Sequence, residues 1–131
     1  MKKLQIVSLS LLFCLIFNLE AISQVPEPED GKGLVVFYRQ KKFSGGGIKF
    51  SVKDSEKNYG QLTNGSTIHI NVEPGEHTFF SQVISSDAIN VEVEVGKVYY
   101  VRATVKTGAI AGRPKFTQVS EKKAHKDLKI E

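Results

Sequence analysis

Three histidines are the side chains best suited to bind a metal or transfer a proton: His69, His77 and His125. His69 lies between two isoleucines and is expected to face away from the core, whereas His77 shares an alternation with Phe79. If their strands pair, the two rings point to opposite faces and cannot ligate one metal ion. The sequence therefore predicts no metal site, and it predicts a partly buried His77 bonded to the neighbouring turn.

The motifs of nucleophilic catalysis do not occur in the sequence. There is no Gly-x-Ser-x-Gly, and the single cysteine, Cys14, lies in an apolar N-terminal run. Glu92 and Glu94 share the exposed face of a predicted strand, whereas a glycosidase needs two carboxylates facing each other across a cleft. The glycines at 45–47 lack the Gly-Lys-Ser/Thr of a phosphate-binding loop. The sequence predicts no catalytic residue and no cofactor.

Arg39, His77 and Arg113 are the candidate binding residues, predicted to lie at the loop end of the fold. Arg39 ends an apolar segment, where an arginine needs a partner, and a Glu or Asp at the rim is expected to hold it. A group of C-terminal lysines, with Arg113 and Lys115, is a further candidate for contact with anionic lipid or glycan, although such a run is usually a solvated face. These lysines are Lys122, Lys123, Lys126 and Lys129.

Alternating apolar and polar residues predict the strands that position these side chains. Residues 34–39 are apolar on both alternations, which is typical of a central strand. Further strands are predicted within 48–53, 59–62, 68–72, 77–83, 89–95, 99–105 and 116–119, with a turn at 64–65. Seven to eight short strands without a long helix indicate an all-β, antiparallel β-sandwich of immunoglobulin-like kind.

Two junctions between strands allow sharper predictions. A tight hairpin turn needs a positive φ at its first central residue, and Pro74 cannot take that value. The strands that flank Pro74 are therefore expected to splay into an arch between two sheets. Strands 89–95 and 99–105 are expected to pair through a three-residue connection, which puts their valines on one face. That register predicts a cross-strand contact between Glu92 and Arg102.

The two ends of the chain differ from its middle. Two lysines precede an apolar run at 4–17, and small residues follow at 21 and 23, so residues 1–23 are predicted to be a signal peptide cleaved near Ser23. The run is shorter than the roughly 20 residues of a membrane span, and no small residues precede Cys14 as a lipoprotein requires. Residues 24–33 are predicted to be a flexible linker, 34–119 the β-sandwich, and 120–131 a basic tail with a short helix capped by Ser120.

Composition narrows the class of protein further. A chain of 131 residues with 40% hydrophobic and 24% charged residues is typical of one folded domain. A net charge of +4 is too small to indicate nucleic-acid binding. With Cys14 removed the chain has no cysteine, so its stability must come from packing.

Four short segments occur in a characteristic order. They are Gly-Leu-Val-Val-Phe-Tyr-Arg at 33–39, Val-x-Pro-Gly-x-His-Thr at 72–78, Gly-Lys-x-Tyr-Tyr at 96–100 and Gly-Arg-Pro at 112–114. In this order they resemble the domain of unknown function 2846 family of exported bacterial proteins. The Pro-Gly segment is also similar to a corner of transthyretin-like and carboxypeptidase-regulatory-like sandwiches, which implies a prealbumin-type topology. The resemblance implies no catalytic residues.

These observations predict an exported, non-catalytic β-sandwich protein of the bacterial cell envelope, secreted or periplasmic. It is expected to bind a protein or glycan of the envelope, or to serve as a structural component, with no nucleic acid as partner and no transmembrane segment after cleavage. The alternative is an envelope hydrolase or glycan-active enzyme with a loop-end site near Arg39, His77 and Arg113.

Overall fold

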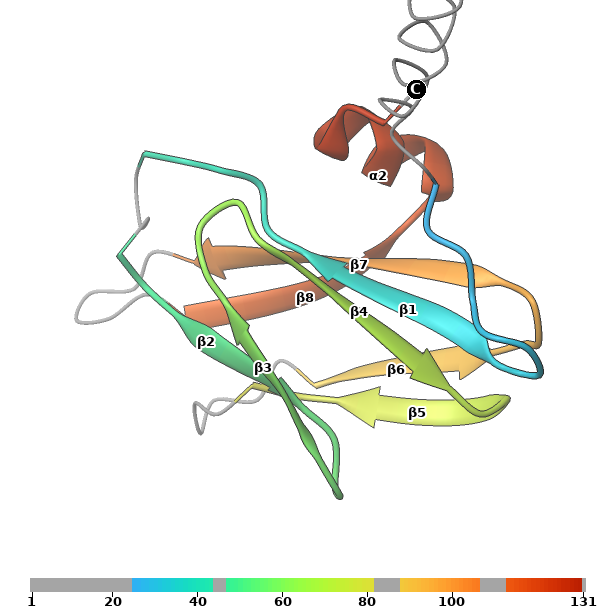
Figure 1. Cartoon of the computed structure of the whole chain (residues 1–131). Helices are drawn as coiled ribbons and strands as arrows, with labels where there is room; N and C mark the ends of the chain where they lie inside the picture. Colours follow the sequence, from blue (N-terminus) through green and yellow to red (C-terminus); the bar gives the residue numbers. More distant parts are fainter. Residues whose placement is uncertain (1–24, 44–46, 82–87, 107–112, 131) are drawn as a thin grey trace, which may run out of the picture.

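The computed structural model describes residues 25–43, 47–81, 88–106 and 113–130, and these form eight strands and one helix (Figure 1). The predicted signal peptide lies outside the described residues. The elements are β1 (Gly33–Tyr38), β2 (Phe50–Lys53), β3 (Asn58–Leu62), β4 (Thr67–Val72), β5 (Gly75–Phe79), β6 (Ile89–Val93), β7 (Val98–Lys106), β8 (Arg113–Val119) and α2 (Glu121–Leu128).

The strands form two layers, which confirms the predicted all-β sandwich (Figure 1). One layer is a sheet of order β4-β1-β7-β8, in which β1 is antiparallel to β4 but parallel to β7. The other contains the antiparallel pairs β2-β3 and β5-β6, joined by a bridge between Lys53 and Phe80. The parallel pair makes the first sheet mixed, where the sequence predicted antiparallel strands throughout.

The core between the layers is built from alternate residues of β1 and its neighbours. Val35 and Phe37 point into it, and Phe37 makes edge-on contacts with Phe79, at 5.1 Å between ring centroids, and with Phe116, at 5.3 Å. Such aromatic contacts add stability beyond the apolar area they remove from water. Both predicted alternations of β1 are buried, and its central position is confirmed.

The second buried face of β1 lies under α2, which forms a third layer on the outer side of the four-stranded sheet (Figure 1). Ala124 is fully buried there against Leu34, Val36 and Tyr38. The residue predicted as the cap, Ser120, accepts a hydrogen bond from the Lys123 amide at 3.2 Å, so the predicted helix is confirmed.

Two side chains on the polar alternation of their strands are buried. Tyr100 is only 1% exposed, because α2 covers the face of β7 on which it lies. Ser51, between the apolar residues Phe50 and Val52 of β2, is 2% exposed. Alternation separates the two faces of a strand but does not say whether another element covers the polar one.

The arch at Pro74-Gly75 is confirmed, since β4 belongs to one layer and β5 to the other. The predicted pairing of strands 89–95 and 99–105 is wrong, because β6 pairs with β5, and β7 lies between β1 and β8. Glu92 lies opposite Glu76 in that register, so the predicted contact with Arg102 is wrong as well. The turn between β6 and β7 passes from one layer to the other, as an arch does.

The segment that precedes β1 is held by hydrogen bonds close to the start of β1. The Glu29 amide donates to Asn71 Oδ1 at 2.9 Å, and the Lys32 amide donates to the Glu29 carbonyl at 3.0 Å. Gly33, predicted as the last linker residue, is buried at the start of β1. The ordered domain therefore begins several residues before position 34.

Candidate functional site

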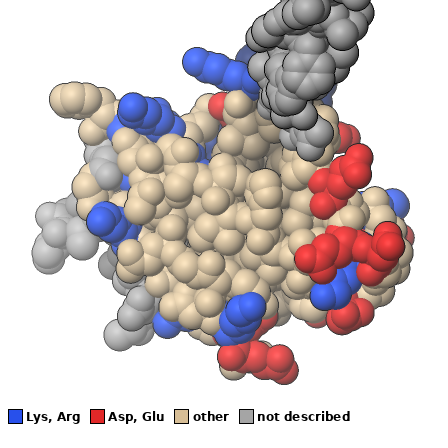
Figure 2. Space-filling view, in the orientation of Figure 1, with Lys and Arg blue, Asp and Glu red and all other residues tan. Residues whose placement is uncertain are grey.

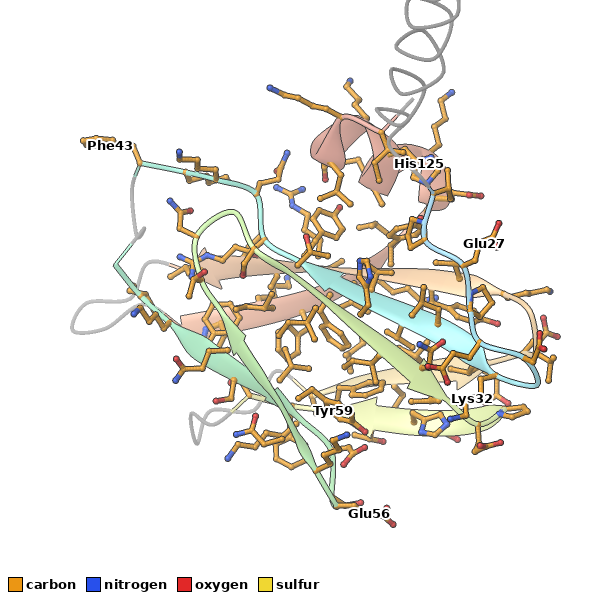
Figure 3. The ribbon with its side chains drawn as sticks, viewed as in Figure 1. Glu27, Lys32, Phe43, Glu56, Tyr59 and His125 are labelled. Carbon is orange, nitrogen blue, oxygen red and sulfur yellow. The ribbon has the colours of Figure 1, made fainter. Side chains whose placement is uncertain are left out.

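An open groove of about 550 Å³ lies between the β2–β3 turn and the start of β5. Figure 3 shows Glu56 at the tip of that turn and Tyr59 on β3 nearby. The groove is bordered by four carboxylates and by aromatic rings. Its lining includes Asp54, Glu56, Tyr59, Glu73, Glu76 and His77.

Asp54 fixes the conformation of the β2–β3 turn, which forms one side of the groove. Its Oδ1 accepts hydrogen bonds from the amides of Glu56, at 2.9 Å, and Lys57, at 2.7 Å, and its Oδ2 accepts one from the Tyr59 hydroxyl. Burial works to raise the pKa of Asp54, but the bonds from Tyr59 and the two amides outweigh it and hold the pKa below its usual value. Asp54 therefore keeps its negative charge while it fixes the turn.

Tyr59 supplies an aromatic ring with an ordered hydroxyl to the same wall. Burial, together with the hydrogen bond to Asp54, raises the pKa of Tyr59 to about 12. Its ring lies edge-on to Phe79, at 6.1 Å between centroids, and the Lys57 ammonium lies 5.4 Å from the ring centroid. The phenol therefore stays neutral at physiological pH, and while its proton is donated to Asp54 its oxygen can accept a hydrogen bond from a ligand.

His77 borders the groove from β5. Its Nε2 lies 2.7 Å from the carbonyl oxygen of Glu73, and its ring stacks on Phe79 with centroids 6.2 Å apart. The prediction of a partly buried histidine bonded to the turn is confirmed. His69 is exposed on β4, in the other layer.

Carboxylates dominate the surface at this end of the molecule. Figure 2 shows acidic side chains gathered at the right-hand end of the molecule, where the β4–β5 turn lies, with basic side chains among them, and a further acidic group at the tip of the β2–β3 turn. The groove combines hydrogen-bond acceptors with aromatic surface, a lining that suits a ligand with hydroxyl or ammonium groups. Within the described residues, no group of three or more His, Cys, Asp or Glu is arranged to hold a metal ion.

A second, smaller hollow of about 40 Å³ lies at the end of β1, where Arg39, Gln40 and Lys42 border residues 102–105 of β7. Arg39 is 5% exposed, its Nη1 donates to the Ile48 carbonyl, and its guanidinium lies 5.3 Å from the centroid of Phe50. Burial lowers the pKa of Arg39 from its usual value. These contacts are to a carbonyl and a ring, so the predicted acidic partner of Arg39 stays a prediction.

The structure does not bring the three predicted binding residues to one site. Arg39 lines the hollow at the end of β1, whereas His77 lines the groove in the other layer. Arg113 begins β8 opposite Lys106, and its side chain lies outside what the structure describes. The C-terminal lysines are exposed on α2 and at its C-cap, Lys129, and Lys123 pairs with Asp127.

Sequence reasoning missed Asp54, Tyr59 and Arg102 as site residues. An Asp that opens a turn and is followed at the fifth position by Tyr was a usable local signal for the first two. Arg102 gave no such signal, because its position beside the end of β1 follows from the parallel pairing of β1 and β7.

The fold and the groove define a sandwich-like all-β protein with a docked C-terminal helix. Residues 29–116 match the family described as protein of unknown function (DUF2846), and the chain belongs to that family. It is also similar to an uncharacterised protein of Haemophilus influenzae (strain ATCC 51907 / DSM 11121 / KW20 / Rd), with 28% identity over 106 residues.

That match covers 80% of this chain but 62% of the relative, so the chain spans less than two thirds of the relative's length. No solved structure matches the chain, and the prealbumin-type topology therefore stays a prediction. No helix within the described residues has the length and apolar character to cross a bilayer.

Proposed function

We propose that this chain is an exported, non-catalytic binding module of the bacterial cell envelope, and that the groove between the β2–β3 turn and β5 binds a glycan. The observation that carries the proposal is the lining of the groove, where four carboxylates surround a neutral tyrosine. Its volume of about 550 Å³ lies in the range of small-ligand sites, about 300–1,000 Å³.

The lining favours a sugar that carries amino groups. Carboxylates accept hydrogen bonds from hydroxyl groups, and they accept stronger, charge-assisted bonds from an ammonium group. The Tyr59 ring adds aromatic surface beside them, flanked by Lys57, and its hydroxyl is held in place by Asp54. Glu56 and Glu76 are exposed at the groove, so a ligand reaches them without displacing the core.

Export is supported by the composition of residues 1–23, with its basic start, apolar run and small residues before position 24. N-terminal sequencing of the protein purified from its native cells tests this part of the proposal. A mature chain that begins at Gln24 in the envelope fraction is expected. An uncleaved chain that begins at Met1 contradicts export by this route.

Binding is tested by calorimetric titration with an oligosaccharide of glucosamine and with its N-acetylated counterpart. We expect the amino form to bind more tightly. Glu76→Gln and Glu56→Gln are each expected to weaken it by about tenfold, which corresponds to about 1.4 kcal/mol. Glu27→Gln is the matched control, since this exposed carboxylate lies outside the groove lining. Equal losses in all three variants indicate general charge attraction and contradict the groove as the site.

The non-catalytic character is tested on the same mixtures by mass spectrometry after prolonged incubation. Intact oligosaccharide is the expected result. Cleavage that Glu76→Gln abolishes favours the alternative of a glycan-active enzyme, with its site in this groove.

A further inference from the structure

Phe43, in the connection between β1 and β2, is a fully exposed aromatic side chain. Figure 3 shows it projecting away from the body of the molecule, at the end where β1 stops. Among the described residues two other large apolar side chains are exposed, Val25 and Val95, and each keeps part of its surface covered. Aromatic rings are enriched where proteins meet partners, because one ring removes a large apolar area from water. Phe43 is therefore the apolar side chain best placed to contact a partner.

The backbone that carries Phe43 is tied to the rest of the fold on both sides. On the side that leaves β1, the Asn64 side chain accepts from the Lys42 amide at 2.9 Å and donates to the Lys42 carbonyl at 2.8 Å. On the side that returns to β2, Arg39 Nη1 donates to the Ile48 carbonyl. The ring is therefore presented by a connection that is held in place before a partner arrives, which lowers the entropic cost of binding.

Four exposed lysines lie at the same end of the molecule as Phe43. Lys41 and Lys42 precede it directly, and Lys49 follows on the way into β2. Lys115 lies near the start of β8, which is at this end because β8 runs antiparallel to β7. In the part of the chain that the structure describes, none of the four forms an ion pair. Their charges therefore face solvent.

Carboxylates are absent from the sequence segments that build most of this end. Residues 39–53, 57–72 and 95–120 contain no Asp or Glu, and they supply the β1–β2, β3–β4 and β7–β8 connections. The β5–β6 connection contains one, Asp87, which lies outside the described residues. In Figure 2 Lys and Arg side chains appear at the left-hand end, whereas acidic side chains gather at the right-hand end. The Phe43 end therefore has a positive potential that favours an anionic partner.

We propose that this end of the molecule docks on the surface of an anionic lipid bilayer, with Phe43 at the boundary between headgroups and acyl chains and the four lysines on the lipid phosphates. A bilayer places apolar chains behind a layer of negative charge, and a projecting ring with cations behind it matches that order. An acidic protein matches the charge, but it must also offer a pocket shaped for the ring. Docking at this end is independent of ligand binding in the groove, since none of these residues lines it.

The test uses tryptophan as a local reporter, because the chain contains none. Phe43→Trp is mixed with vesicles of phosphatidylcholine containing phosphatidylglycerol, and with vesicles of phosphatidylcholine alone. With the anionic vesicles we expect the emission to shift to shorter wavelengths and to be quenched by brominated acyl chains, and we expect salt to weaken both effects. No change with the anionic vesicles, or an equal change with both kinds, overturns the proposal.

Val95→Trp is the matched control, since Val95 is also exposed but follows Glu94 in the turn between β6 and β7. Its emission is expected to stay unchanged. The readout is local, so vesicle binding by the apolar run at 4–17, in a chain that retains it, does not imitate docking through Phe43. Equal quenching of the two reporters indicates attachment through another part of the chain and overturns the proposal.

Charge variants in the Phe43→Trp background locate the lysines that act. Lys42→Gln and Lys49→Gln are each expected to weaken vesicle binding about fivefold, whereas Lys122→Gln, on the exposed side of α2, changes it less than about twofold. Equal losses in all three variants indicate attraction to the net charge of the protein and contradict the assignment. Soluble polyglutamate is the last arm. If it changes the emission of the reporter as the anionic vesicles do, an acidic protein replaces the bilayer as the partner and the proposal is overturned.

Discussion

At the scale of single residues, Asp127 shows how α2 is fixed to the sheet. Its side chain is 4% exposed, and it accepts a hydrogen bond from the Tyr38 hydroxyl at 2.7 Å and another from the Lys123 ammonium. Burial works to raise the pKa of Asp127, but the bonds from Lys123 and Tyr38 outweigh it and hold the pKa below its usual value. The charged form of Asp127 therefore stabilises the docked helix.

This pKa predicts a pH dependence of stability. A carboxyl with a lowered pKa in the folded state stabilises the protein above its unfolded pKa of about 4, and that stabilisation is lost as the pH falls through the folded value. Asp127→Asn is expected to lower the free energy of unfolding by about 1–2 kcal/mol at pH 7. This is the size expected for the loss of a charge-assisted hydrogen bond that water partly screens. Urea unfolding at neutral and acidic pH checks this, and the variant should lose less stability than the wild type below about pH 4. An equal acid response in both proteins contradicts the prediction.

Gly33 is a residue whose lack of a side chain the packing requires. A Cβ built at this position meets Val93 Cγ1 at 2.2 Å and the Glu94 carbonyl oxygen at 2.8 Å. Gly33→Ala is therefore expected to lower the free energy of unfolding by about 1–3 kcal/mol through overpacking. Gly47→Ala is the control, since no atom beyond its chain neighbours lies within 4 Å of its Cβ position. Denaturant unfolding compares the stability of the two variants. Equal stability would show that the β6–β7 turn can move to make room for the added methyl group.

At the scale of elements, the partners of β7 decide which charges interact. Arg102 lies on the face of β7 toward α2, 3.9 Å from Asp127, while Glu92 lies on β6 in the other layer. The polar face of a strand therefore interacts with whichever element covers it, and for β7 that element is the C-terminal helix α2.

Double-mutant cycles test this arrangement. The pair Arg102→Gln with Asp127→Asn is expected to show a coupling energy of about 0.5–1 kcal/mol, because the two charges are close and partly buried. The pair Arg102→Gln with Glu92→Gln should be additive within about 0.3–0.5 kcal/mol. Both energies come from denaturant unfolding of the single and double variants. If Arg102 is coupled to Glu92 instead of Asp127, the result contradicts this arrangement and favours the predicted pairing of strands 89–95 and 99–105.

At the scale of the whole molecule, α2 converts a two-layer sandwich into three layers. It covers one apolar cluster of the four-stranded sheet: Leu34, Val36, Tyr38 and Tyr100. Each of these side chains is at most 1% exposed with the helix in place. The C-terminal segment is therefore part of the fold and not a solvated tail.

Removal of residues 121–131 is expected to lower the free energy of unfolding by about 3 kcal/mol or more, because several large side chains lose their apolar cover. The exposed patch should also bind the dye ANS. Lys122→Gln with Lys126→Gln is the control, since it alters the exposed face of α2 and is expected to change stability by less than about 0.5 kcal/mol. Thermal unfolding and ANS fluorescence measure both, and a truncated chain of wild-type stability contradicts the three-layer account.

Part of the candidate site was predictable from the sequence. The bond between His77 and its turn is local, since His77 and Glu73 are four residues apart. The hollow at the end of β1 was not predictable, because the end of β1 and residues 102–105 are far apart in sequence and become neighbours only through the parallel pairing of β1 and β7. Arg39 and His77 both stood out as single residues, but only the assignment of their strands to different layers separates them.

The sequence by itself determined the strands, the arch at Pro74, the capped helix at Ser120 and the two buried faces of β1. These features depend on the alternation of neighbouring residues, on the φ preference of proline or on a capping side chain. Each of these effects involves only residues that are close together in the sequence. The tertiary structure alone decided that β6 and β7 lie in different layers and that α2 covers Tyr100. An alternating strand buries its apolar face equally well beside many partners, so the choice among them rests on the packing of the whole chain.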